Sequence, residues 1–266
     1  MNDGETIPQM GFGLWQVPGD QTARVVGEGL AEGYRLVDGA AIYGNEEGLG
    51  AGMRQPGVAR DAVFVTTKVW NDDQGYDATL RAFDASARRT GLDRFDLYLI
   101  HWPCAANGLF VDSWRAMIRL REEGRVTSIG VSNFGADHLA RLVAETAVTP
   151  ALNQIELHPF LQQAALRKTH ADMGIITQSW TPLGQGLAFD AAPVRSIAAR
   201  LGASPAQVIL AWHLALGCSV IPRSTRRAGL AENLQAGSLA LTAEDLTALA
   251  TLDRGQRLGP DPAVFS

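Results

Sequence analysis

Eight short apolar runs recur along the chain and alternate with longer segments that carry helical spacing. Runs of this kind, rich in β-branched residues, are typical of parallel strands that helices cover on both faces. Several of the intervening segments close at glycine, as helix C-termini do: Gly33, Gly91, Gly124 and Gly174. Eight such units in 266 residues predict an α/β protein with a (β/α)8 TIM barrel fold. The expected strands are residues 10–14, 34–38, 62–68, 95–101, 127–133, 151–156, 175–180 and 218–224.

The interval before the last strand is the longest and holds two helical patterns. One lies near Pro193 to Leu201, and the other opens with Ser204 as N-cap and Pro205 at the first helical position. We therefore expect an extra helix before strand eight. No internal repeat, low-complexity tract or Gly/Ser linker is present, so we expect a single barrel domain over residues 1–266. The remaining expected helices are residues 21–32, 77–90, 113–123, 136–146 and 164–173.

Net charge and the numbers and spacing of cysteines and histidines argue against several classes of partner and site. The net charge is −5 without a run of five like charges, which argues against nucleic acid and acidic membranes as partners. Cys104 and Cys218 are far apart and form no C-x-x-C pair, which excludes a disulfide scaffold and a cysteine zinc site. The five histidines are scattered, so we expect no metal. Neither a signal-peptide core nor a long apolar span is present, so we expect a cytoplasmic protein.

Polar residues stand at the C-terminal ends of nearly all the expected strands. In a (β/α)8 barrel these ends converge on one face, where the active site lies. Each residue alone has a structural explanation, since Asp38 and Lys68 could form an ordinary buried ion pair and His101 could be a satisfied core histidine. Their shared position favours an active site. The set comprises Asp38, Lys68, His101, Ser132, Asn133, Gln154, Glu156, Trp180, Arg223 and Ser224.

Tyr43 follows Asp38 by five residues, on a short turn that could place its phenol over the same mouth. If Tyr43 donates a proton, its pKa of about 10 must fall toward neutrality. We expect the Lys68 ammonium to lower this pKa and Asp38 to hold the lysine in place. His101 would then form a hydrogen bond beside the reacting oxygen. Ser132 and Ser179 lack the context of a nucleophile elbow, which argues against serine hydrolase chemistry.

With these residues in place, the sequence resembles the aldo-keto reductases, and within them the bacterial 2,5-diketo-D-gluconate reductases. The resemblance covers essentially the whole chain. By that resemblance Asp38, Tyr43, Lys68 and His101 form a catalytic tetrad with Tyr43 as general acid. The motifs that carry it are "NDGETIPQMGFG", "DGAAIYGNEEGLG", "VTTKVWND", "DLYLIHWP", "SIGVSNF", "NQIELHP", "SWTPLGQG" and "IPRSTRRAGLAENL".

The resemblance also implies NADPH as cofactor, extended across the barrel mouth without a Rossmann domain, with NADH as a weaker alternative. Three positions depart from the family pattern: Gly39 replaces a threonine, Arg223 a lysine, and Gly229 an arginine that covers the adenine. The loss at Gly229 weakens the expected preference for NADPH. The implied cofactor-binding residues are Ser132, Asn133, Gln154, Trp180, Leu183, Gln185, Arg223, Ser224, Thr225, Arg226, Glu232 and Asn233.

Aromatic residues that follow strand ends are expected to line the substrate pocket: Trp15, Trp70, His101 and Trp102. We expect a small aldehyde, ketone or keto-sugar acid as substrate, and a monomeric protein. Two other functions stay open. One is a regulatory or structural barrel that binds the cofactor without significant turnover. The other is a phosphosugar-handling barrel, for which "PLGQG" (182–186) is a weak candidate phosphate site.

Overall fold

The computed structural model describes residues 1–265, and Ser266, the last residue of the expected domain, lies outside the described residues. Each strand pairs in parallel with its neighbour in the chain. An isolated parallel bridge between Met10, just before the first strand, and Val220 in the last strand links the two ends of the sheet. The predicted (β/α)8 barrel is confirmed. Its strands are β1 (Phe12–Gly13), β2 (Leu36–Asp38), β3 (Phe64–Val69), β4 (Phe95–Ile100), β5 (Val126–Ser132), β6 (Leu152–Glu156), β7 (Ile176–Trp180) and β8 (Ser219–Val220).

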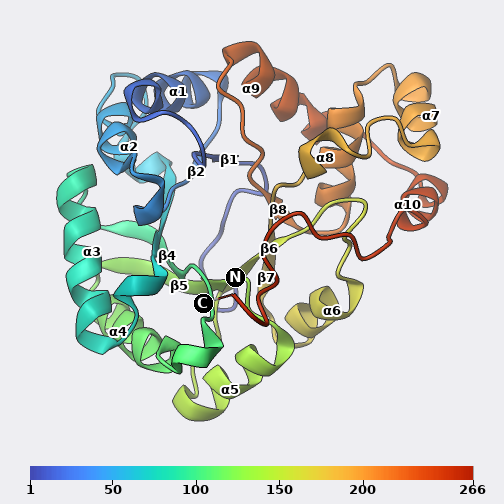
Figure 1. Cartoon of the computed structure of the whole chain (residues 1–266). Coiled ribbons are helices and arrows are strands. Elements are labelled where there is room, and N and C mark those ends of the chain that lie inside the picture. The colour runs from blue at the N-terminus through green and yellow to red at the C-terminus, as the bar shows by residue number, and fades with distance from the viewer. Residues whose placement is uncertain (266) are drawn as a thin grey trace.

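Helices surround the barrel (Figure 1). Both α7 and α8 lie between β7 and β8, which confirms the extra helix before strand eight. The helices are α1 (Gly19–Glu32), α2 (Glu46–Met53), α3 (Tyr76–Thr90), α4 (Phe110–Glu122), α5 (Ala136–Thr146), α6 (Ala164–Asp172), α7 (Ala192–Leu201), α8 (Pro205–Ala215), α9 (Arg227–Leu234) and α10 (Ala243–Ala250).

The sequence pattern did not predict α2, whose three glycines are poor helix formers. Close packing requires them: a Cβ at Gly50 would lie 1.8 Å from the Thr90 carbonyl oxygen, and one at Gly52 would lie 2.5 Å from Val26 Cβ. The neighbouring helices therefore stabilise α2 through contacts that only glycine permits.

Helix ends follow the expected chemistry. The four predicted stop residues all adopt left-handed backbone, with φ of 109° at Gly33, 67° at Gly91, 71° at Gly124 and 69° at Gly174, a conformation that glycine adopts without strain. At the start of α8, the Ser204 hydroxyl accepts a hydrogen bond from the Gln207 N–H. These local signals fix where the helices begin and end.

Successive side chains of a strand point to opposite faces of the sheet, so the strands contribute to two separate hydrophobic regions, one outside and one inside the barrel. Side chains on one face of each strand pack against the helices in the main core, as Val65 and Tyr98 do. Side chains on the other face point into the barrel, where Leu97, Leu99 and Leu152 form a small cluster that Ile7 contacts. The residues before β1 therefore fill the N-terminal end of the barrel.

The eighth strand is shorter than expected. It ends at Val220, whereas the sequence pattern extended it to residue 224, because Pro222 has no N–H to donate to a neighbouring strand. The segment from Ile221 to the start of α9 is a loop at the barrel mouth. Among the described residues, no helix combines the length and apolar character that crossing a membrane requires.

Candidate active site

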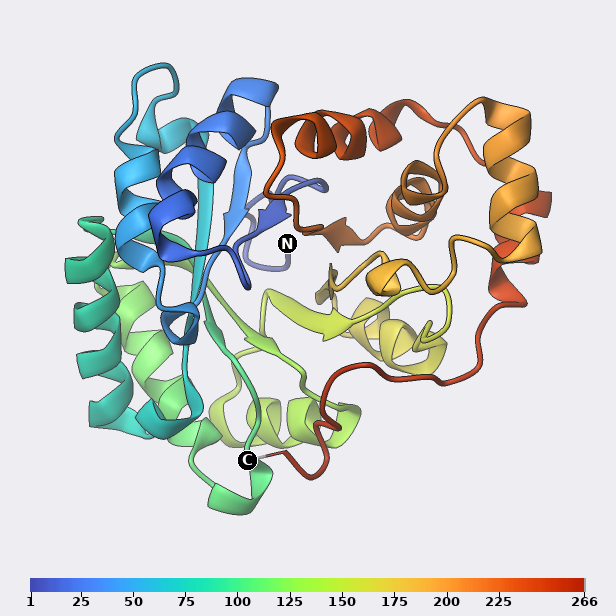
Figure 2. The same cartoon turned by 45° about the horizontal axis from the view of Figure 1, so that its top comes forward.

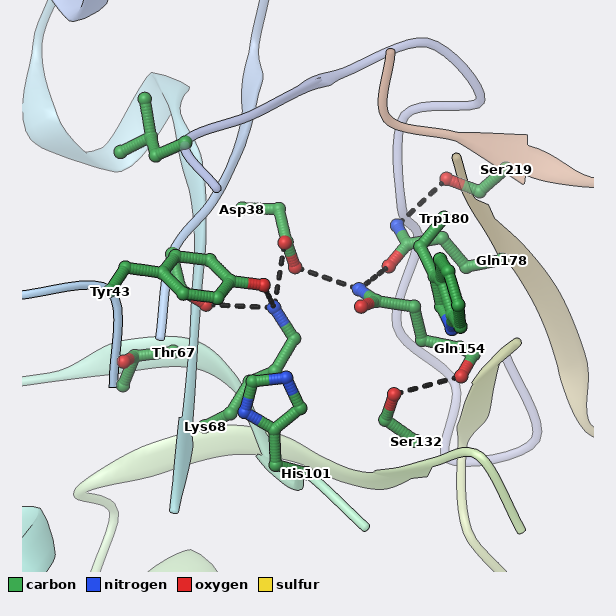
Figure 3. Close-up of polar contacts among 12 residues, drawn as sticks. Asp38, Tyr43, Thr67, Lys68, His101, Ser132, Gln154, Gln178, Trp180 and Ser219 are labelled. Atoms are coloured by element: carbon green, nitrogen blue, oxygen red, sulfur yellow. Dashed lines mark hydrogen bonds and ion pairs between the residues drawn. The ribbon is translucent and has the colours of Figure 1, made fainter. Parts of the chain in front are cut away.

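The mouth of the barrel gathers the polar residues that end the strands, because alternation turns every second side chain inward. Asp38 on β2, Lys68 on β3, Gln154 on β6 and Gln178 on β7 are all inward and buried. His101 follows β4 and lies beside Lys68 in Figure 3. The strand-end positions predicted from the sequence therefore meet in one place.

Asp38 and Lys68 form a buried ion pair, with Lys68 Nζ 2.6 Å from Asp38 Oδ2. Lys68 Nζ also donates to the Gly39 carbonyl oxygen at 2.8 Å. The second Asp38 oxygen accepts from Gln154 Nε2 at 2.7 Å, so both carboxylate oxygens have donors although residue 39 is glycine. Removing either ion would leave an unpaired buried charge, at a cost of roughly 3–5 kcal/mol.

Tyr43 closes a short 3-10 turn, η1 (Ala41–Tyr43), which swings its ring over the mouth. Its hydroxyl lies 3.4 Å from Lys68 Nζ, and its ring meets the His101 ring edge to face at 5.8 Å. Figure 3 shows the phenol, the ammonium and the imidazole turned toward one another. The implied tetrad therefore lies within one set of direct contacts.

The pKa directions correct one expectation. Burial, and then the nearby Asp38 carboxylate, raise the pKa of Tyr43 well above its ordinary 10.0, whereas the sequence argument expected Lys68 to lower it. Burial also lowers the pKa of Lys68, and the Asp38 carboxylate opposes this shift. Burial, and then the Lys68 ammonium, hold the pKa of His101 well below 6.5. At neutral pH the phenol is protonated and the imidazole is neutral.

The other half of the mouth carries Ser132, Asn133 and Trp180. Asn133 has a φ of 64°, a conformation that asparagine tolerates better than most residues. Its Nδ2 donates to the His101 carbonyl oxygen at 3.0 Å, and its Oδ1 accepts from Trp180 Nε1 at 2.8 Å. Ser132 Oγ donates to the Gln154 carbonyl oxygen at 2.8 Å. The Trp180 indole is therefore held at the mouth beside the tetrad.

The loops after β7 and β8 carry the other implied cofactor residues. Leu183 and the exposed Gln185 lie in the loop after Trp180. Ser224 Oγ accepts from the Arg226 N–H at 3.2 Å and Thr225 follows it in the turn that opens α9, while Glu232 and the buried Asn233 lie within that helix. Arg223 and Arg226 are exposed and pair with no carboxylate among residues 1–265.

Gly229 packs directly under this turn. A Cβ at residue 229 would lie 2.5 Å from Ser224 Oγ, so the arginine that the family pattern carries here would displace Ser224. From the sequence alone, Gly229 is expected only to lose an adenine contact. The structure shows that glycine also leaves room for the hydroxyl of the turn.

The expected substrate-pocket aromatics take different positions. Trp15 is 48% exposed on the loop after β1. The Trp70 ring lies 5.1 Å from the His101 ring, at the mouth. Trp102 is buried between Trp180 at 6.5 Å and Phe265 at 4.6 Å. Trp70 therefore borders His101, Trp102 packs between Trp180 and Phe265, and Trp15 reaches toward solvent.

A residue that the sequence argument did not assign to the site is Phe265, which lies far from Trp102 in the chain. It belongs to the C-terminal segment, residues 257–265, the last part of the chain that follows α10; Figure 2 shows this chain in red as it runs to the C-terminus. Glu156 at the end of β6 holds this segment: its Oε1 accepts from the Leu258 N–H at 2.6 Å and its Oε2 from the Gly259 N–H at 3.0 Å. Glu156 was noted as a strand-end residue, but it binds the chain itself.

Gln178 and Ser219 were also missed. Gln178 precedes Trp180 by two residues on β7, so strand alternation alone could have placed it inside the barrel. Ser219 is its strand partner on β8. Within residues 1–265, no three His, Cys, Asp or Glu side chains are grouped so as to hold a metal ion.

Comparison with known proteins gives a consistent result. A family model described as the aldo/keto reductase family matches residues 9–254. An aldo-keto reductase of Mycolicibacterium smegmatis is 50% identical over 266 residues, 100% of this chain and 97% of its own. Methylglyoxal reductase DkgA of Escherichia coli is 43% identical over 267 residues, 100% of this chain and 96% of its own. A crystal structure of a Gox0644 mutant in complex with NADPH superposes with a TM-score of 0.95 at 47% identity, covering 99% of this chain and 96% of that chain.

Proposed function

The chain belongs to the aldo/keto reductase family and is an oxidoreductase, and on this basis we propose that it reduces a small carbonyl compound to the alcohol with NADPH. The observation that carries the proposal is the contact of Tyr43 Oη with Lys68 Nζ at the barrel mouth, where Lys68 is itself held by a buried bond to Asp38. Catalysis requires a proton donor beside the position of a carbonyl oxygen, and this group supplies one.

Tyr43 is the proposed general acid. Because its pKa is raised, the phenol keeps its proton at neutral pH and holds it until charge develops on the carbonyl oxygen. The Lys68 ammonium, 3.4 Å from Tyr43 Oη, stabilises the phenolate that forms when the proton leaves. Asp38 keeps the ammonium in position, and the neutral His101 imidazole forms a hydrogen bond to the same oxygen.

The residues present fit NADPH. The cofactor, when bound, supplies the hydride that adds to the carbonyl carbon. The Trp180 indole, held by Asn133, offers a flat face for stacking at the mouth. Arg223 and Arg226 carry guanidinium groups without carboxylate partners among the described residues, which suits the 2′-phosphate. Ser132, Asn133 and Gln154 would bind the carboxamide, and Leu183 and Gln185 would lie along the pyrophosphate.

The proposed substrates are small aldehydes, ketones or keto-sugar acids. Trp70 packs against His101 of the tetrad, and Trp102, next to His101 in the chain, packs against Phe265. Methylglyoxal, a small ketoaldehyde, is the first compound to test, because DkgA relatives at 43% identity are named methylglyoxal reductases.

The test is steady-state reduction of a carbonyl panel, followed at the absorbance of the reduced nicotinamide, with NADPH and with NADH. We expect turnover of small aldehydes and ketoaldehydes, faster with NADPH. NADPH binding without turnover of any carbonyl would instead support the regulatory barrel. Competition of free phosphate with NADPH would show whether the loop at residues 182–186 serves the cofactor.

A further inference from the structure

A chain of hydrogen bonds between buried side chains runs down the inside of the barrel from the tetrad to the partly buried Pro8 of the N-terminal segment. We propose that Gln178 and Ser219 are positioning residues that fix the side-chain amide of Gln154 through this chain, and that they thereby set how Gln154 meets the cofactor. The inference rests on the proposed function. We call the hydrogen bonds that join Asp38, Gln154, Gln178, Ser219 and Pro8 the interior chain.

Four hydrogen bonds make up the interior chain. Gln154 Nε2 donates to Asp38 Oδ1 at 2.7 Å and to Gln178 Oε1 at 2.6 Å. Gln178 Nε2 donates to Ser219 Oγ at 3.0 Å, and Ser219 Oγ donates to the Pro8 carbonyl oxygen at 3.1 Å. Figure 3 shows the bonds from Asp38 to Ser219 as one continuous line. The side chains of Asp38, Gln154, Gln178 and Ser219 are all buried.

The donor and the acceptor of each bond can be assigned in turn, starting from Asp38. Asp38 is paired with Lys68, so it is ionised and can only accept. The Gln154 atom that faces Asp38 must then be the amide nitrogen. The same nitrogen faces Gln178, so the Gln178 atom opposite it must be the carbonyl oxygen, and Gln178 turns its nitrogen toward Ser219.

The Pro8 end requires the same direction. A backbone carbonyl can only accept a hydrogen bond, so the Ser219 hydroxyl must donate its one proton to the Pro8 carbonyl oxygen. Its oxygen then accepts, and Gln178 must present its nitrogen to it. Two acceptors at opposite ends of the barrel therefore impose a single orientation on both amides between them.

The consequence for the site lies at Gln154. Both hydrogens of its amide nitrogen are used within the interior chain, so its Oε1 is the side-chain group left for a further partner. An acceptor in this position binds an N–H donor, such as the amino group of the nicotinamide carboxamide. Without Gln178 the Gln154 amide keeps its bond to Asp38 but loses its second fixed point. Without Ser219 the Gln178 nitrogen loses its acceptor, and a buried unsatisfied polar group destabilises the arrangement that binds cofactor.

The test uses the full chain and four variants: Ser219→Ala, Ser219→Thr, Gln178→Met and the double variant Gln178→Met/Ser219→Ala. The matched control is Thr177→Val, which removes a buried hydroxyl of the same strand whose partner is His170 on the outer face of the barrel. NADPH affinity is measured by quenching of tryptophan fluorescence, and kcat and KM are measured with the best carbonyl of the panel.

We expect Ser219→Ala and Gln178→Met each to weaken NADPH binding about five- to twentyfold, with a smaller fall in kcat. Ser219→Thr keeps the hydroxyl and should bind as the wild type does. The double variant should bind no more weakly than Gln178→Met alone, because one break already disconnects the chain. Thr177→Val should lower thermal stability and leave NADPH affinity unchanged.

The inference would be overturned if Ser219→Ala bound NADPH as tightly as Thr177→Val does. It would also be overturned if the losses of NADPH affinity in the two single variants added fully in the double variant. Ser219→Ala decides the question even if Gln178→Met fails to fold. Failure of the proposed function has a different signature, because the wild type itself would then turn over no carbonyl, whereas binding of NADPH still reports on the interior chain.

Discussion

At the scale of single residues, Tyr43 Oη is the atom on which the proposed chemistry depends. Tyr43→Phe removes this oxygen and leaves the ring contacts with His101 in place. We expect kcat for carbonyl reduction to fall at least about 100-fold while the Kd for NADPH changes less than about twofold. Tyr76→Phe, at an exposed tyrosine on α3, is the control. Retention of more than about a tenth of the wild-type kcat would remove Tyr43 from the acid role.

The pKa direction of Tyr43 gives a second residue-scale prediction. The folded pKa lies above 10.0, so the proton-donating form persists from neutral pH into the alkaline range. We expect kcat to stay flat from about pH 6 to about pH 9 and to fall only at higher pH. A fall that begins near neutrality would mean that Lys68 lowers the phenol pKa, as the sequence argument expected, and that burial is outweighed.

Arg223 carries the cofactor prediction. Its exposed guanidinium has no carboxylate partner among the described residues and can meet the 2′-phosphate that NADH lacks. We expect Arg223→Ala to raise the KM for NADPH at least about tenfold and to change that for NADH little. Arg195→Ala, at an exposed arginine on α7, is the control. Equal losses for both cofactors would show that Arg223 does not bind this phosphate.

At the scale of elements, the C-terminal segment is held by one carboxylate. Burial raises the pKa of Glu156, but hydrogen bonds from His158, Leu258 and Gly259 outweigh it, so the pKa lies below 4.5 and the group is ionised. Glu156→Gln turns an N–H toward these donors. We expect faster hydrogen exchange in residues 257–265 and a several-fold higher carbonyl KM, because Phe265 leaves Trp102. Glu145→Gln on α5 is the control, and unchanged exchange would contradict the role.

At the scale of the whole molecule, two buried histidines make stability depend on pH. Burial lowers the pKa of His170 to about 4 and that of His213 to about 3 from the ordinary 6.5. Both are neutral when folded, so their contribution is complete above pH 6.5 and is lost as the pH falls toward these values. At about pH 5 each histidine takes up a proton when the protein unfolds, and this should lower the free energy of unfolding by about 2 kcal/mol per histidine.

Urea unfolding near pH 7.5 and near pH 5 measures this loss. His170→Gln and His213→Gln should each show a smaller drop between the two pH values than the wild type, whatever their stability at neutral pH. Equal drops in all three proteins would mean that other groups govern acid unfolding. The single domain over residues 1–266 stays a prediction, which the shape of the same curves addresses, because one domain unfolds in one transition.

Local pattern determined the architecture and the membership of the mouth. Alternating apolar runs and helical segments predicted the barrel, glycines predicted the helix ends, and strand-end positions predicted that Asp38, Lys68, His101 and Gln154 would meet. These features could be read from the sequence because the periodicity of a strand or helix, and the direction of its side chains, depend only on neighbouring residues.

The long-range hydrogen bonds and the pKa direction of Tyr43 depend on closure of the barrel. The bond from Ser219 to Pro8 joins residues 211 apart, and that from Gln154 to Asp38 joins residues 116 apart, so neither leaves a local signal. The pKa direction of Tyr43 was misjudged for the same reason: a neighbouring charge can be guessed from the sequence, but desolvation depends on everything that packs around the group. Burial and the choice of hydrogen-bond partner arise only when distant segments meet in the folded barrel.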